Sequence, residues 1–235
     1  LVPLVFAAIY QENTLPMFFL AFTIPMIGGF LSWLPARNMK GEIRIRDGFI
    51  ITVLFWLVLS TFGALPFALS QETNLSFIDA LFESISGLTT TGATVFTNLE
   101  DLPKSILYYR QQLQWLGGIG IVVIAVSILP MIGVGGMQIY KAETPGPIKD
   151  TKLTPRIAET ANALFKIYVF LTVVCAIAYW VAGMSWFDAL SHSFSTISIG
   201  GFSTYDESLG HFDNNAVLTI ASIFMVISGL NFALH

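Results

Sequence analysis

Five long stretches of the chain contain no Asp, Glu, Lys or Arg. An α-helix needs about 20 consecutive apolar residues to cross the hydrocarbon core of a bilayer. Each of the five stretches has 21 to 28 residues, so the pattern predicts five membrane-spanning helices. They cover residues 13–36, 48–70, 113–140, 167–187 and 214–235.

The opening run, residues 1–11, is apolar but too short to cross a bilayer. It has neither the basic n-region nor the small-residue cleavage site of a signal peptide. The run is therefore interpreted as the end of a helix whose beginning is absent. The fifth stretch stops at His235 without a polar tail, so both ends of the chain are expected to be cut from a longer protein.

Composition supports a membrane location. Of the 235 residues, 54% are hydrophobic and 11% are charged, whereas soluble domains carry about 25% charged residues. The net charge of −4 argues against binding to nucleic acid, which requires a basic surface. The single cysteine, Cys175, lies in an apolar stretch and excludes an intrachain disulfide framework. The chain is predicted to be an all-α integral membrane protein.

The basic residues gather on one side of the predicted membrane. Nine of the 11 lie between the first and second stretches or between the third and fourth. Cytoplasmic loops carry an excess of Lys and Arg, so loops 35–47 and 134–166 are predicted to be cytoplasmic. The nine residues are Arg37, Lys40, Arg44, Arg46, Lys141, Lys149, Lys152, Arg156 and Lys166.

An internal repeat links the spans. Residues 76–92 match residues 185–201 at an offset of 109 positions, and each copy lies between two predicted spans. The repeating unit is therefore a span, a short segment and a second span. The chain is divided into a leading transmembrane helix pair (1–46), a first repeat (47–145) and a second repeat (146–235). Seven pairs are identical: Ser76/Ser185, Asp79/Asp188, Ala80/Ala189, Leu81/Leu190, Ser84/Ser193, Ser86/Ser195 and Gly92/Gly201.

Each short segment has the pattern of a re-entrant helix followed by a loop. Ser76 with Asp79, and Ser185 with Asp188, have the spacing of a helix start with an acidic first turn. About eleven helical residues follow, too few to span. Because both flanking spans meet the segment on the outer side, it must enter the membrane and return. The partial negative charge at its inner end would favour a cation.

The uncharged loops that follow, residues 89–94 and 198–203, supply candidate ligands. Glycine permits positive φ, so consecutive carbonyl oxygens can turn toward one axis, as they do in potassium filters. The alternative is that both glycine turns are ordinary helix C-caps, and the recurrence at one offset favours the filter. The proposed potassium ligands are the backbone carbonyls of Thr90, Thr91, Gly92, Ala93, Ile199, Gly200, Gly201 and Phe202.

These two loops resemble the pore loops of the TrkH/KtrB/HKT superfamily of cation transporters, most closely the TrkH family. The resemblance also includes residues 109–118, 142–152 and 154–160. It implies potassium uptake across the bacterial cytoplasmic (inner) membrane by a multi-pass homodimer, with potassium as the transported ligand and no covalently bound cofactor. It further implies four span–pore-loop–span repeats and a cytosolic nucleotide-binding regulatory ring (TrkA-like). Two of the four repeats are in this chain, so the remaining two are expected from the full-length protein.

Several other polar and small residues have structural interpretations. Glu83 and His192 occupy equivalent positions, and their mismatch argues against a shared role, favouring packing or an aqueous outer vestibule. Arg110 is predicted to start its span at the outer interface and to snorkel. The glycines at 117, 118 and 120 are predicted to permit close helix packing.

Three function classes remain: a channel-like transporter, a carrier-type symporter with alternating access, and a membrane scaffold that transports nothing. Two spans per repeat keep successive repeats in the same orientation, which suits a ring about the membrane normal, whereas many carriers use inverted repeats. The chain has no HExxH or GxSxG motif, and its three histidines have no metal-ligand spacing. Neither an enzyme nor a transition-metal site is expected.

Overall fold

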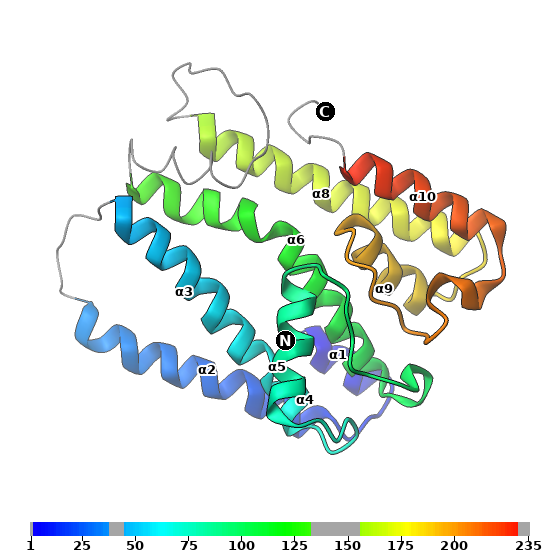
Figure 1. The fold of residues 1–235 in the computed structure, drawn as a ribbon, viewed down its shortest axis with the longest axis horizontal. Helices are drawn as coiled ribbons and strands as arrows, with labels where there is room; N and C mark the ends of the chain where they lie inside the picture. Colours follow the sequence, from blue (N-terminus) through cyan, green and yellow to red (C-terminus); the bar gives the residue numbers. More distant parts are fainter. Residues whose placement is uncertain (1, 38–44, 133–155, 230–235) are drawn as a thin grey trace.

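The computed structural model describes residues 2–37, 45–132 and 156–229, and every regular element in these ranges is a helix (Figure 1). The predicted all-α fold class is confirmed. The longer helices are α2 (Leu15–Ala36), α3 (Ile45–Gly63), α6 (Lys104–Ile132), α8 (Arg156–Val181) and α10 (Asn215–Gly229). The shorter ones are α1 (Val2–Ile9), α4 (Leu65–Leu69), α5 (Phe77–Leu88) and α9 (Trp186–Ile197), with 3-10 turns η1 (Leu99–Asp101) and η3 (Ser208–Phe212).

Three apolar segments among the described residues are long enough to cross a membrane: Leu15–Ala36, Ile50–Leu69 and Asn162–Val181. They correspond to the first, second and fourth predicted spans. The second is divided, because α3 ends at Gly63 and α4 begins after Ala64 with Pro66 in its first turn. The predicted end of the fourth span at residue 187 is wrong. Gly183 has a φ of +105°, which turns the chain after Val181.

The third and fifth predicted spans are found in part. Helix α6 begins at Lys104, nine positions before the predicted start, because Arg110 lies inside the helix rather than at its end. The stretch beyond Ile132 lies outside the described residues. Helix α10 covers Asn215–Gly229 of the fifth predicted span, and residues 230–235 also lie outside them. Helix α1 confirms that the opening run is helical.

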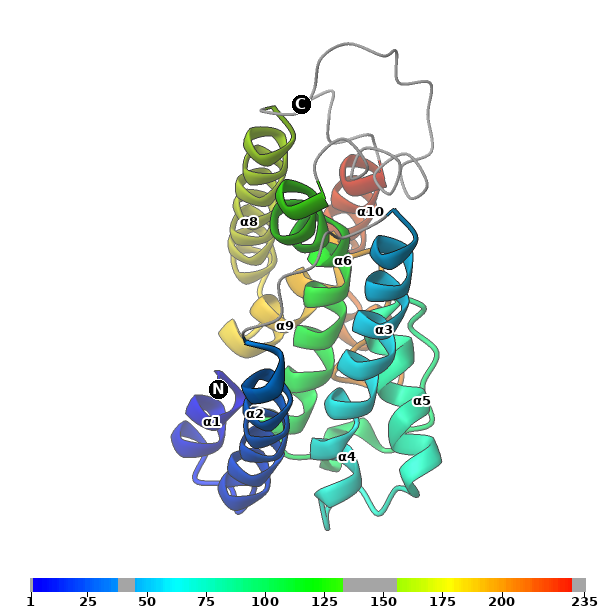
Figure 2. The same ribbon diagram turned by 90° about the vertical axis from the view of Figure 1, so that its left-hand side faces the viewer.

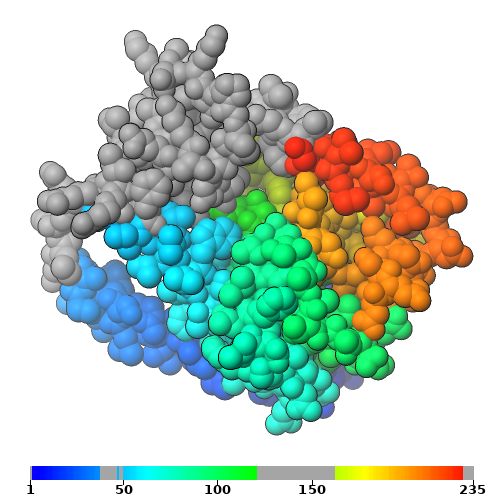
Figure 3. All heavy atoms as spheres, in the orientation of Figure 1, coloured from blue at the N-terminus to red at the C-terminus, as the bar shows by residue number. Residues whose placement is uncertain are grey.

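Helix α6 occupies the centre of the structure (Figures 1 and 2). It packs against α3 and α5 on one side and against α8 and α9 on the other. Helix α9 is enclosed by α6, α8 and α10, and ten of its twelve residues are buried. Helix α5 buries six of twelve, and Figure 3 shows it at the surface of this face. The two short helices therefore share one scaffold helix.

Three glycines of α6 permit this close packing, as the sequence predicts. A Cβ at Gly117 would overlap the carbonyl group of Leu88, the last residue of α5. A Cβ at Gly118 would overlap the Tyr168 hydroxyl, and one at Gly120 would overlap the Trp56 ring. Close approach at glycine, to backbone at Gly117 and to aromatic side chains at Gly118 and Gly120, is how small residues bring membrane helices together.

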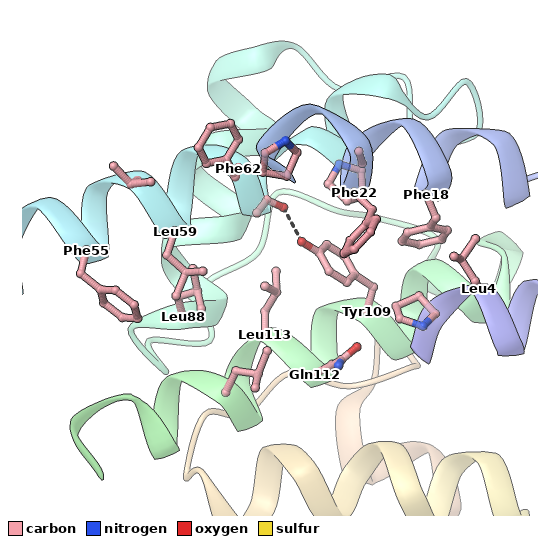
Figure 4. Close-up of a pocket in the computed structure, with 17 residues that line it drawn as sticks. Leu4, Phe18, Phe22, Phe55, Leu59, Phe62, Leu88, Tyr109, Gln112 and Leu113 are labelled. Atoms are coloured by element: carbon pink, nitrogen blue, oxygen red, sulfur yellow. Dashed lines mark hydrogen bonds between the residues drawn. The ribbon is translucent and has the colours of Figure 1, made fainter. Parts of the chain in front are cut away.

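A cavity of about 400 Å³ lies between α1, α2, α3 and α6, and its walls are almost entirely apolar (Figure 4). Tyr109 extends into it from α6 and donates a hydrogen bond from Oη to the Gly63 carbonyl, 2.9 Å away. Leu88 and Leu113 close the cavity on the side of α5. The leading helix pair is therefore less densely packed against the first repeat than α5 is against α6.

Replacing Gly117 by Ala should destabilise the complete protein by about 1–3 kcal/mol, because the new methyl group meets backbone rather than a movable side chain. The measurement is the thermal unfolding of the purified protein. Gly29→Ala is the matched control, since a Cβ at Gly29 in α2 has no neighbour within 4 Å. Equal unfolding temperatures for the two variants would contradict the proposed close contact.

Candidate functional site

The two loops singled out by sequence follow α5 and α9, and both helices begin as predicted. The Ser76 hydroxyl accepts a hydrogen bond from the Asp79 amide at 3.2 Å. The Ser185 hydroxyl accepts one from the Asp188 amide at 3.1 Å. Each hydroxyl satisfies an amide of the first helical turn that has no partner within the helix. Residues 89–94 are called the first loop and residues 198–203 the second loop.

Both helices also end in the same hydrogen-bonded turn. The amides of Thr90 and Thr91 donate to carbonyls in the last turn of α5, at 3.0 Å each. Their counterparts 109 positions later, Ile199 and Gly200, donate to the last turn of α9 at 3.1 and 2.8 Å. This pair of bonds is the Schellman arrangement, which satisfies the free carbonyls at a helix C-terminus.

Each loop contains two residues with positive φ, again at equivalent positions. Gly92 and Gly201, which are identical in the two copies of the repeat, have φ values of +75° and +81°, as expected. Thr90 and Ile199 have φ values of +55° and +54°. Left-handed backbone is rare for β-branched residues and costs about 1–3 kcal/mol each. The sequence does not predict positive φ at Thr90 and Ile199, because β-branched side chains disfavour the left-handed conformation.

The two loops meet at their glycines. A Cβ at Gly92 would overlap the Gly200 carbonyl oxygen, so the two backbones lie in direct contact. Thr91, Ala93 and Gly201 are exposed in the described structure, and one side of each loop is therefore open. The Ala93 carbonyl accepts from the Ser86 hydroxyl, which uses one of its two lone pairs.

Glu83 holds the end of the first loop. Its carboxylate is fully buried and accepts from the Thr94 hydroxyl at 2.9 and 3.0 Å and from the Val95 amide at 3.1 Å. Arg110 donates from Nε to the same carboxylate at 2.8 Å. A buried carboxylate needs such compensation, because its unpaired charge is costly within a membrane protein.

The prediction that Arg110 snorkels at the interface is wrong, because the side chain is 0% exposed. Beyond Glu83, its guanidinium donates to the Ser203 carbonyl and to the Thr94 hydroxyl, at 3.0 Å each. It also lies over the Phe202 ring, with 4.4 Å from Cζ to the ring centroid. Arg110 therefore binds both loops at once. The signal in the sequence was one acid and one base, each well inside a largely apolar helix.

His192 binds the hydroxyl at the end of the second loop, as Glu83 binds the hydroxyl at the end of the first. Its Nδ1 lies 2.9 Å from the Asp188 carbonyl and must carry a proton, because a carbonyl can only accept. Its Nε2 then accepts from the Ser203 hydroxyl at 2.9 Å. Ser203 is the counterpart of Thr94, so the expectation that Glu83 and His192 share no role is wrong. Both side chains are buried, as the packing interpretation predicts and an aqueous outer vestibule does not.

Acidic side chains join the segments that follow the loops. Asp206 accepts from the amides of Asn98 and Leu99, at 2.8 and 3.1 Å, and so links the two repeats. Asp188 accepts from the Tyr205 hydroxyl at 3.2 Å. Burial, and then the nearby Asp188 carboxylate, raise the pKa of Tyr205 to about 12, because both disfavour the phenolate. These contacts were not predicted, because they join residues far apart in sequence.

The chain has close similarity to known transporters. Residues 14–235 match the family model TrkH, described as a cation transport protein. The chain is 56% identical over its whole length to the Trk system potassium uptake proteins TrkH of Vibrio parahaemolyticus and Escherichia coli, covering 48% and 49% of them. It is 47% identical over 232 residues to TrkG of Escherichia coli, covering 99% of this chain and 48% of that protein.

A solved structure has the same fold. The crystal structure of the potassium transporter TrkH from Vibrio parahaemolyticus superposes with a TM-score of 0.83 at 51% sequence identity. The match covers all of this chain and 47% of that one. The chain therefore spans about half the length of the curated relatives it matches.

Replacing Arg110 alone by Met should cost about 3–5 kcal/mol of stability, because the Glu83 carboxylate is left buried without its counter-charge. The double variant Glu83→Met/Arg110→Met should be more stable than Arg110→Met. Arg37→Met, at an exposed position at the end of α2, should change stability by less than about 0.5 kcal/mol. Unfolding of the purified complete protein is the measurement, and additive effects of the two buried substitutions would disprove the coupling.

Proposed function

The chain belongs to the TrkH family of cation transport proteins, and we propose that it forms half of a channel-like pore for potassium uptake across the bacterial inner membrane. The observation that carries the proposal is the pair of uncharged loops with matching backbone conformation that touch at Gly92 and Gly200. The relatives named as potassium uptake proteins give the transported ion.

The direction of the backbone amides supports a filter of carbonyl oxygens. In a planar trans peptide the N–H group and the preceding carbonyl point to opposite sides. The Thr91 and Gly200 amides donate back into their own short helices, so the carbonyls of Thr90 and Ile199 face away from them. Carbonyl oxygens turned away from the protein can replace the hydration shell of potassium. The negative ends of α5 and α9 add attraction for a cation.

The proposed ligands remain the backbone carbonyls of residues 90–93 and 199–202, two sides of a filter that four repeats would complete. The exposed apolar side chains of α5, which include Phe77, Ile78 and Phe82, offer a face for further helices. The remaining two pore repeats, a second copy of the protein and a cytosolic nucleotide-binding ring (TrkA-like) are the partners of this proposal.

The proposed orientation puts the two basic segments in the cytoplasm. The ends of α2, α3, α6 and α8 that adjoin these segments lie toward the upper and left side of Figure 1, and the opposite ends of α3 and α8 lie away from it. This arrangement supports alternating passages through one membrane, with both short helices entering from the outer side.

Flux measurements on the complete protein in liposomes separate the three function classes. A channel-like pore passes rubidium in either direction according to its own electrochemical gradient. A symporter makes rubidium flux depend on the gradient of a second ion, and a scaffold gives no flux above empty liposomes. We expect the first result, and either of the others would overturn the proposal.

Gly92→Ser should lower the rubidium-to-sodium permeability ratio about tenfold, equivalent to about 1–2 kcal/mol for one poorly made carbonyl contact. The added side chain opposes a φ of +75° and meets the Gly200 carbonyl. The serine hydroxyl would also narrow the ion path, which disfavours rubidium, the larger ion, more than sodium.

The control is Gly210→Ser, at a glycine with no neighbour within 4 Å and no positive φ. It should leave the permeability ratio unchanged. A parental ratio in Gly92→Ser at normal expression would mean that Gly92 only ends a helix.

A further inference from the structure

The side chain of Gln114 lies at the junction of the two loops. It is fully buried on α6, and its Oε1 accepts a hydrogen bond from the Phe202 amide at 3.1 Å. Its amide group also packs against Gly200, where any Cβ would come within about 2.6 Å of Nε2 and Oε1. Gln114 thus reaches from the first repeat to the backbone of the second loop.

This hydrogen bond fixes the direction of a neighbouring carbonyl. The Phe202 amide and the Gly201 carbonyl belong to one planar trans peptide, so they point to opposite sides. Because the amide points at α6, the Gly201 carbonyl points away from α6. Gly201 has a φ of +81° and no side chain, so packing of its own atoms does not set this orientation.

Among the described residues, no side chain accepts a hydrogen bond from the Ala93 amide, which is the counterpart of the Phe202 amide in the first loop. The counterpart of Gln114 at the same offset is Ile223 on α10, which is 52% exposed and has no polar group to offer. The counterpart of Gly200 is Thr91, whose hydroxyl pairs with Thr89 at 2.8 Å. The two loops therefore share a backbone conformation, but a side chain of α6 binds the backbone of the second loop, whereas the first loop has a hydrogen bond between its own hydroxyls.

We propose that Gln114 is a positioning residue that holds the Gly201 carbonyl toward the ion path and so contributes to the preference for potassium over sodium. The inference rests on the proposed function. A carbonyl that swings out of place leaves a larger ion incompletely coordinated, whereas sodium loses less because it retains more of its water.

Three variants of the complete protein test this role. Gln114→Met has nearly the same volume but no acceptor for the Phe202 amide, and should lower the rubidium-to-sodium permeability ratio several-fold. Gln114→Glu keeps an acceptor oxygen and should restore most of the ratio, since an added charge attracts both monovalent cations alike. Gln111→Met is the matched control, because Gln111 is buried on the same helix and its amide has no hydrogen-bond partner among the described residues. Its ratio should equal that of the parent.

Hydrogen–deuterium exchange of residues 198–203 gives a readout that does not depend on transport. Exchange at the Phe202 amide should be about tenfold faster in Gln114→Met, the effect of one lost hydrogen bond, and unchanged in Gln111→Met. Absence of rubidium flux in the parent would refute the proposed function, while exchange would still test the contact. Unchanged exchange, or equal losses of selectivity in Gln114→Met and Gln114→Glu, would overturn the role of Gln114.

Discussion

The ion pair between Glu83 and Arg110 is the interaction on which the two loops depend. Each charge alone is expensive in the interior of a membrane protein, and the pair is further stabilised by hydrogen bonds between both side chains and the two loops. Glu83 binds the end of the first loop, and Arg110 extends to the Ser203 carbonyl in the second. One buried pair thus fixes two segments that have no regular secondary structure of their own.

The repeat is more nearly symmetric in its backbone than in its side chains. Both short helices have the same cap, the same terminal turn and positive φ at the same positions. Glu83 and His192 differ in charge and chemistry, yet each binds the hydroxyl two residues after the loop glycine. Buried polar groups of irregular backbone need hydrogen-bond partners, and different side chains meet that requirement in each copy.

The sequence predicts correctly those features that depend only on residues close together in the chain. Apolar length identified the first, second and fourth spans, the Ser-x-x-Asp spacing identified both helix starts, and glycine identified one left-handed position in each loop. Features that depend on distant residues were missed. Burial of Arg110 requires Glu83 on another helix, and the left-handed Thr90 and Ile199 contradict their own preferences. Neither the burial of Arg110 nor the left-handed backbone of Thr90 and Ile199 can be predicted from local sequence, because tertiary contacts override the local preference of these residues.

The central place of α6 has a consequence for biogenesis. Arg110 and Gln114 leave the ribosome well before their partners in the second loop, since 93 and 88 residues separate Arg110 from Ser203 and Gln114 from Phe202. The first repeat can complete its own pairing between Glu83 and Arg110, but the contacts to Ser203 and Phe202 form only after α8 and α9 have been synthesised. Helix α6 is then already present when the second repeat folds, and the second loop acquires its geometry by docking onto it.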